Sequence, residues 1–344
     1  IVAQAIPIMI LPYFTKVLSS DVIGIYLLWL SVAAMIVSVG SLAFDQAMFV
    51  SKTIEELMST FRALFILCGL FFITFLVCYF LLDDLFQINF MPESVRNYII
   101  PLLLYSYSFV LMSGLFSYLV YHSRFSEVSI VKIFIALPVG FFQCLTIWLG
   151  YGIEGLIYSQ SIITFVIVIL YLKKNNTYPF FRVVDHGVLT AVKKCKKFIL
   201  LSTPATTINT FSGQLPMLLI ASNFGLTVSW LYGLANKILT VPSTLLSGSI
   251  MTVFKDEAGV EYRETGQCLK AYFKTFKMLI LISIIPFVIL FFTVENIFVL
   301  VFGIEWAVSG YYAKILMPFV FFRMKAKLVK QKMIESIIDT KKGK

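Results

Sequence analysis

The chain has 344 residues, of which 59% are apolar and only 13% are charged, about half the charged fraction usual in soluble domains. With a mean hydropathy of +0.91, it carries more apolar surface than a soluble chain of this length can bury, which argues against a soluble enzyme. The 34 Phe and 17 Tyr exclude intrinsic disorder. The composition therefore predicts a membrane protein, and the net charge of +10 needs an explanation in those terms.

Apolar runs recur along the whole chain. A helix needs about 20 apolar residues to cross the hydrocarbon core, and a spanning backbone must satisfy its own hydrogen bonds as a helix. Ten runs approach this length, the first clipped and the last short. They cover residues 1–17, 22–44, 63–82, 98–121, 128–150, 153–172, 198–222, 225–253, 275–294 and 309–322. We therefore predict an all-α, polytopic integral membrane protein with about ten transmembrane helices.

The Lys and Arg residues lie almost entirely in alternate connections between these runs. Twenty-four of the 28 fall in 45–62, 122–132, 173–197, 254–277 and the tail, whereas Lys16 and Arg96 alone occupy the intervening connections. Because cytoplasmic loops are enriched in Lys and Arg, the pattern predicts that both termini face the cytoplasm. The net positive charge is then a signal of topology, and we expect no nucleic-acid partner.

A long basic connection divides the chain into two predicted lobes. Six spans precede this connection and four follow it, and both halves open on similar segments, with Gln4, Pro7 and Tyr26 corresponding to Gln214, Pro216 and Tyr232. Parallel repeats of this kind place a transporter's substrate site at the repeat interface. The expected domains are a six-helix N-lobe (1–172), a basic cytoplasmic linker (173–197), a four-helix C-lobe (198–322) and a hydrophilic basic tail (323–344).

Ionisable residues inside spans are costly and usually face a cavity or a partner. Lys237 lies mid-span, so a cavity-lining role competes with a purely structural ion pair. Lys314 lies nearer a span end, where it can also snorkel to the interface. Asp45 and Arg124 lie at span ends, where a solvated cap and a positive-inside anchor are the alternatives to a binding role.

The 198–222 span is unusually polar, with four Thr, Asn209, Ser212 and Gln214 beside two Pro. We expect it to line an aqueous cavity with Asn209 and Gln214 among the contacts, the alternative being helix packing through small residues. Tyr105 and Tyr107 on the fourth span and Gln143 on the fifth are further candidates for contacts with sugar rings. The candidate substrate-binding residues are Lys237, Lys314, Asn209, Gln214, Arg124 and Asp45.

Enzyme signatures are absent from the sequence. The five Cys show no paired spacing and there are only two His, so we expect no metal, cofactor or disulfide framework. The sequence has neither a phosphate-binding loop nor an HExxH motif, and no Ser/His/Asp arrangement can be argued. We therefore expect a protein without catalytic residues, and any energy for transport to come from an ion gradient or a downstream process.

Four segments carry a resemblance to a known family. They are QAIPIMILPYFTKVLSSDVIGIY at the start, AFDQAMF at 43–49, PMLLIASNFGLTVSWLYGLANKILTVPSTLLSG in the second half, and FGIEW at 302–306. Together they resemble the polysaccharide exporters of the multidrug/oligosaccharidyl-lipid/polysaccharide superfamily, above all the O-antigen flippases of the Wzx type. The resemblance covers most of residues 4–320.

The resemblance implies a fold of twelve helices in two lobes with alternating access. It implies that undecaprenyl-diphosphate-linked oligosaccharide, the O-antigen repeat unit, moves from the cytoplasmic to the periplasmic leaflet of a bacterial inner membrane. That is a lipid-transport step of lipopolysaccharide biosynthesis, in which a polysaccharide polymerase and a chain-length regulator are possible partners. An intramembrane cation such as Lys237 would suit the anionic diphosphate.

Two features depart from the family pattern. Gln214 stands where many relatives carry an acidic residue, which puts proton or sodium coupling there in doubt. The chain also lacks an initiator Met and its last 22 residues cannot span a bilayer, so we expect it to be truncated at both ends, with spans eleven and twelve missing. The alternatives are a drug or cation antiporter of the same fold and, from another class, a membrane polysaccharide polymerase or glycosyltransferase.

Overall fold

The computed structural model describes residues 2–48, 51, 53–86, 93–175, 186–265 and 269–339. These residues form helices and their connections, with no strand among them, as the sequence predicted. The chain divides into two compact units, Val2–Trp230 and Leu231–Lys344, which are described separately. The division falls after Trp230, whereas the lobe boundary was expected at 173–197; the predicted lobes, linker and tail stay a prediction.

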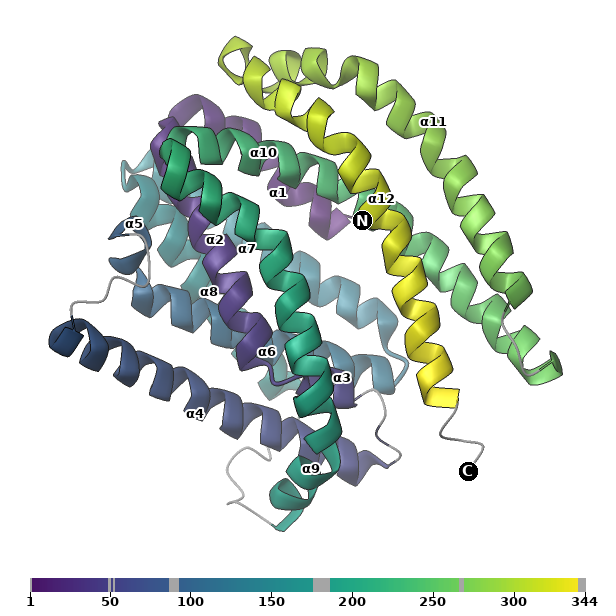
Figure 1. The fold of residues 1–344 in the computed structure, drawn as a ribbon. Helices are drawn as coiled ribbons and strands as arrows, with labels where there is room; N and C mark the ends of the chain where they lie inside the picture. Colours follow the sequence, from purple (N-terminus) through teal and green to yellow (C-terminus); the bar gives the residue numbers. More distant parts are fainter. Residues whose placement is uncertain are drawn as a thin grey trace. The chain divides into compact units, whose positions relative to one another are not determined.

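Within the part of the first unit that the structure describes, there are nine helices, a π-helical turn and the first part of a tenth helix (Figure 1). These elements are α1 (Val2–Val17), α2 (Ser20–Gly40), α3 (Phe44–Met48), α4 (Ile54–Phe86), α5 (Glu93–Arg96), α6 (Ile99–Tyr121), α7 (Phe125–Trp148), α8 (Gly152–Lys174), α9 (His186–Lys197), η2 (Phe198–Ser202) and α10 (Thr203–Thr265).

Six helical segments of the described chain are long and apolar enough to cross a membrane, as expected of a multi-pass membrane protein. They are Ser20–Gly40, Ile54–Leu81, Ile99–Tyr121, Phe125–Trp148, Gly152–Lys174 and Ile199–Thr240. Two shorter apolar helices, Ala5–Val17 and Phe287–Phe302, coincide with parts of other predicted spans. The full count of about ten stays a prediction.

The core of the first unit lies around α2. Helix α6 packs against α2, α4 and α8, while α7 packs against α8 and α1. Trp29 and Leu28 on α2 and Phe44 on α3 are completely buried, and the Trp29 ring lies 5.3 Å from the Tyr105 ring of α6. Close approach is possible where α2 carries glycine, since a Cβ on Gly40 would stand 3.0 Å from the Phe72 ring.

A sharp turn joins α2 to α3. Leu42 and Ala43 both adopt left-handed backbone conformations, with φ of 47° and 52°, which cost non-glycine residues about 1 kcal/mol or more each. The turn is held by backbone hydrogen bonds from the Leu42 N–H to the Val39 carbonyl and from the Phe44 N–H to the Ser41 carbonyl. Ala43 and Phe44 are buried at this point, so packing offsets the backbone strain.

Helix α4 begins at Ile54, nine residues before the predicted start of its span at 63. The extension has a local cause: the Thr53 hydroxyl accepts a hydrogen bond from the Glu56 N–H at 3.2 Å, which is an N-cap, and Glu55 and Glu56 favour the positive end of the helix dipole. Charged residues here end the apolar run without ending the helix.

Helix α10 contains a break at Gly225. Its backbone there has φ 84° and ψ 172°, a conformation that is essentially restricted to glycine. The sequence predicted separate spans over 198–222 and 225–253, and the break at Gly225 agrees with that division. Residues 255–265, predicted as part of a cytoplasmic connection, continue the helix after the break.

The second unit consists of the end of α10 followed by α11 (Leu269–Phe302), η3 (Ile304–Trp306) and α12 (Ala307–Asp339), and Figure 1 shows α11 and α12 running alongside each other. Gly303, with φ 108°, makes the turn. Gly310 lets the two helices approach closely, since a Cβ there would stand 2.9 Å from the Glu295 Cα. Residues 323–339 of the predicted tail extend α12 as a helix.

Candidate functional site

A cavity of about 320 Å³ lies within the first unit, among α2, α3, α6 and the first part of α10. Its volume is at the lower end of the range for small-molecule sites, about 300–1,000 Å³. Eight of the twelve residues that line it have polar side chains, although most of the lining surface is apolar. The twelve lining residues are Leu30, Ala34, Val37, Ser38, Ser41, Asp45, Gln46, Tyr105, Phe109, Ser113, Thr206 and Thr210.

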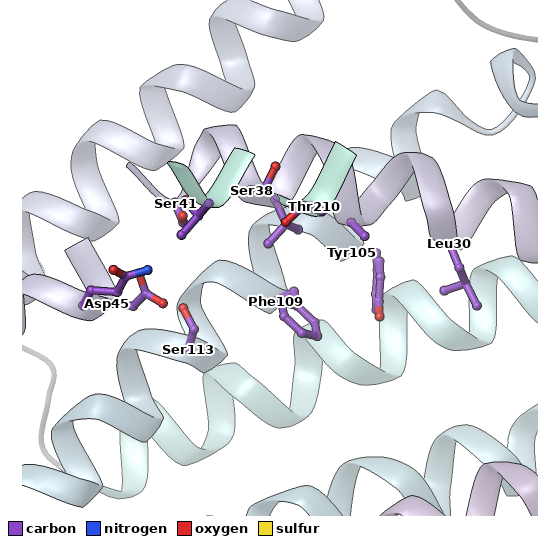
Figure 2. A pocket seen from close by; sticks show the side chains of 12 residues that line it. Leu30, Ser38, Ser41, Asp45, Tyr105, Phe109, Ser113 and Thr210 are labelled. Atoms are coloured by element: carbon purple, nitrogen blue, oxygen red, sulfur yellow. The ribbon is translucent and has the colours of Figure 1, made fainter. Parts of the chain in front are cut away.

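The polar groups are unevenly distributed along the cavity. Figure 2 shows Asp45 at one end, with Ser41 and Ser113 nearby, and Leu30 at the opposite end. Asp45 is the only one of the twelve lining residues with a charge at neutral pH. The turn through Leu42 and Ala43 directs the chain so that α3 presents this carboxylate to the cavity.

Burial raises the pKa of the Asp45 carboxyl above its ordinary value, while hydrogen bonds from the backbone N–H groups of Gln46 and of Asp45 itself act in the opposite direction. The Ser117 hydroxyl donates to the Asp45 backbone carbonyl at 3.1 Å, which ties α3 to α6. The carboxylate is therefore held by backbone N–H groups of α3, and α3 is itself tied to α6 at this residue.

Three hydroxyl groups of the cavity lining already donate their protons within the protein. Those of Ser38, Ser113 and Thr206 donate their protons to backbone carbonyls of their own helices, at 2.7, 2.8 and 3.0 Å. A hydroxyl oxygen that has donated its only proton still has lone pairs to offer. With the Asp45 carboxylate, the cavity is rich in acceptors and suits a ligand that donates hydrogen bonds, such as a sugar with several hydroxyls or an organic cation.

Aromatic rings form part of the cavity wall. Tyr105 and Phe109 line it from α6, with ring centroids 6.1 Å apart, and Trp29 lies behind Tyr105. A hydrogen bond joins the Tyr105 phenol to the side-chain amide of Gln160 on α8. Such rings offer an apolar face next to hydrogen-bonding groups, a combination suited to the faces and edges of sugar rings.

Gln160 belongs to a buried polar network behind the cavity wall. The Tyr26 hydroxyl donates to Gln160 Oε1 at 3.0 Å. Gln143 Nε2 donates to the Tyr26 hydroxyl at 3.0 Å and to the Leu156 carbonyl at 3.2 Å. Gln143 therefore joins α7 to α2 and α8. It was expected as a possible sugar contact, and the structure instead places it in contacts between helices.

Of the six predicted binding residues, Asp45 alone lines this cavity. Asn209 is exposed and Gln214 is half-buried, and both are on the same helix as Thr206 and Thr210, which do line it. Arg124 donates to Glu127 Oε1 at 2.6 Å and to Asn175 Oδ1 at 2.9 Å. These contacts join the start of α7 to the end of α8, and the role of Arg124 as a positive-inside anchor stays a prediction.

The two lysines predicted to lie in membrane spans, Lys237 and Lys314, belong to the second unit and differ in their partners. Lys314 Nζ lies 3.0 Å from Glu295 Oε1 and 5.5 Å from the Phe291 ring centroid, so its charge is paired across the α11–α12 hairpin. Lys237 is half-buried, and no residue that the structure describes forms an ion pair or hydrogen bond with it. The two side chains thus form a matched pair for experiment.

Several lining residues escaped prediction from sequence, namely Ser38, Ser41, Gln46 and Ser113. Ser38 and Ser41 are three residues apart and so share one helix face, but single hydroxyls in apolar spans are common in helix packing. Tyr107, which was considered with Tyr105, contacts α4 instead, where its hydroxyl donates to the Phe65 carbonyl at 3.4 Å.

Comparisons of the chain with known protein families, curated proteins and solved structures found no match. Among the described residues, no group of three or more His, Cys, Asp or Glu side chains is arranged to hold a metal ion.

Proposed function

We propose that the protein moves undecaprenyl-diphosphate-linked oligosaccharide from the cytoplasmic to the periplasmic leaflet of a bacterial inner membrane, by alternating access between two helical lobes. The observation that carries this proposal is the acceptor-rich cavity with its aromatic wall, set among membrane-spanning helices. An acceptor-rich site costs little to fill with a hydroxylated ligand, because each sugar hydroxyl that enters can keep a hydrogen bond. The resemblance to polysaccharide exporters supports the same substrate class.

The position of the cavity fits the entry step of this process. Ser41 and Asp45 follow the end of α2, and Ser113 lies toward the end of α6; both ends are predicted to face the cytoplasm from the distribution of Lys and Arg. The cytoplasmic leaflet is where the cargo would be loaded. The sugars are the part of the cargo that suits this cavity, whereas a carboxylate such as Asp45 repels a diphosphate.

The diphosphate requires a cation elsewhere. We propose Lys237 for this role, because its ammonium group has no counter-charge among the described residues, whereas Lys314 is already paired with Glu295. A charged group left without a partner inside a membrane span is expensive, and binding an anionic headgroup compensates for that cost during transport.

The two lysines provide the experiment. The chain is reconstituted in liposomes with a lipid-linked oligosaccharide that carries a fluorescent sugar, and transfer between leaflets is followed by a membrane-impermeant quencher. We expect Lys237→Gln to slow transfer at least tenfold, while Lys314→Gln remains within about twofold of the unmodified protein. Equal rates for Lys237→Gln and the unmodified protein would remove Lys237 from the mechanism, and no transfer by the unmodified protein would refute the function.

A second function, export of an organic cation in exchange for protons, is favoured by one observation. Asp45 is the single charged group of the cavity, and it is a carboxylate with a raised pKa. The same liposomes with a pH gradient and a fluorescent lipophilic cation separate the two proposals. Uptake of the cation that is abolished by Asp45→Asn, without transfer of the lipid-linked sugar, would favour the antiporter.

A further inference from the structure

Helix α9 has one apolar face that is fully used inside the protein. Val188, Ala191 and Cys195 recur at intervals of three and four residues, and all three are buried. Helix α9 packs against α4, and Figure 1 shows it beside one end of that long helix. Because these three side chains are already covered, a further partner would meet the polar side of α9.

The opposite face of α9 is basic. Lys193, Lys194 and Lys196 are exposed. Lys194 Nζ lies 3.2 Å from Glu56 Oε1, whereas neither Lys193 nor Lys196 is ion-paired with any residue in the ranges that the structure describes. Two ammonium groups therefore point outward with no counter-charge from the described protein.

The starts of two membrane spans indicate the depth of this basic face relative to the bilayer. The span Ile199–Thr240 begins two residues after α9 ends, and the span Ile54–Leu81 begins beside Glu56, the partner of Lys194. Apolar side chains are exposed immediately beyond the helix, with Leu201 72% exposed. Helix α9 therefore lies where the apolar surface of the spans starts, which is the depth of lipid headgroups.

We propose that Lys193 and Lys196, on the exposed face of α9, bind the phosphate groups of anionic phospholipids at the membrane surface. Basic clusters on helices at this depth attract anionic lipids, each Lys or Arg adding a favourable term that salt weakens. The ion pair with Glu56 holds α9 against α4, so that Lys193 and Lys196 remain available to the lipid. This inference requires only that the chain spans a membrane and does not depend on the transported substrate.

Native mass spectrometry of the purified chain tests the proposal, with phosphatidylglycerol and phosphatidylcholine titrated separately. We expect the tightest-bound phosphatidylglycerol to bind roughly 30-fold more weakly to the double variant Lys193→Gln/Lys196→Gln, with phosphatidylcholine binding unchanged. The matched control is Lys16→Gln. Lys16 is exposed and is predicted to lie on the opposite side of the membrane from α9, so this change should leave the affinity for the tightest-bound phosphatidylglycerol unaltered.

A second variant separates charge from folding. Lys193→Arg/Lys196→Arg keeps both charges and should bind phosphatidylglycerol within about twofold of the unmodified protein. Unchanged phosphatidylglycerol affinity in the glutamine double variant would overturn the proposal. So would an equal loss in the arginine double variant, because that result would assign the effect to disturbed packing of α9.

Discussion

The first unit contains two clusters of polar side chains that satisfy their hydrogen bonds in different ways. In the network of Tyr26, Gln143 and Gln160, donors and acceptors meet inside the protein across three helices. Around the cavity, the hydroxyls of Ser38 and Ser113 donate their protons to their own helices, so that their oxygens can only accept further hydrogen bonds. The polar residues of these two clusters thus differ in role: those of the network join helices, and those of the cavity can accept hydrogen bonds from a ligand.

Tyr105 connects the two clusters, since it lines the cavity and is hydrogen-bonded to Gln160. The comparison predicts that substitutions in the network change stability and leave the activity of the folded protein intact. Substitutions of uncharged side chains in the cavity should do the reverse, whereas Asp45, a buried carboxyl, should also affect stability. The following experiments measure stability, transfer of the lipid-linked sugar, or both, and together they test this distinction.

The largest effect is expected from Gln143→Leu. The change removes the donor to the Tyr26 hydroxyl and to the Leu156 carbonyl, and each buried group left without its partner costs about 1–3 kcal/mol. We expect a loss of about 3 kcal/mol, measured by thermal unfolding in detergent. Ser212→Ala, at an exposed site, should change stability by less than about 0.5 kcal/mol. An unaltered melting curve for Gln143→Leu would contradict the structural role of the network.

Tyr105→Ala should reduce transfer of the lipid-linked sugar about tenfold. An aromatic contact contributes roughly 0.5–1.5 kcal/mol beyond area burial, and about 1.4 kcal/mol corresponds to a factor of ten. Tyr105→Phe keeps the ring and should retain most of the rate. Tyr107→Ala is the matched control, because that ring packs near Phe65 and Phe72 and not on the cavity. If both alanine variants lose transfer equally per folded molecule, the cavity assignment is wrong.

Asp45→Asn should change how stability depends on pH. Because the folded protein raises the pKa of this carboxyl, the folded state holds the proton more tightly than the unfolded state. Stability from this group is therefore complete below the ordinary pKa of 3.8 and is lost as the pH rises through the raised value. We expect Asp45→Asn to be more stable than the unmodified protein at neutral pH, with the difference shrinking in acid, as seen in unfolding curves across that range. A gap that widens in acid would mean that the carboxylate is stabilised in the fold.

The smallest effect is expected from Thr210→Val, which conserves shape and removes one hydroxyl from the cavity lining. We expect a two- to fivefold decrease in transfer, the size of a single neutral hydrogen bond, without loss of stability. Asn209→Ala, one residue away but exposed, should leave transfer within experimental error. A stronger effect at Asn209 than at Thr210 would favour the binding role that sequence alone assigned to it.

Sequence alone predicted much of the fold, because long apolar runs in a bilayer leave the backbone few options. The break at Gly225 could also be placed, since two apolar runs meet there. The early start of α4 was missed because the Thr53 cap lies in a charged segment that ends the apolar signal. Helix continuation past residue 255 was missed for the same reason.

The candidate site was predicted less well. Asp45 stood out as a charge at a span end, and the polarity of the 198–222 span pointed to the helix that carries Thr206 and Thr210. The sequence does not show which face of that helix lines the cavity, so Asn209 and Gln214 were as plausible as Thr206 and Thr210. Ser38 and Ser113 look like ordinary packing residues until the neighbouring helices are in place, because their role depends on contacts between distant segments.

The turn at Leu42 and Ala43 has a consequence for how the carboxylate beyond it behaves. Glycine would form that turn without backbone strain, but it would also give the following segment more conformational freedom. Leu42 and Ala43 both carry side chains, and Ala43 is buried among its neighbours. The turn therefore has one conformation, which fixes the orientation of Asp45. The strained backbone of this turn thus keeps the Asp45 carboxylate in one orientation toward the cavity.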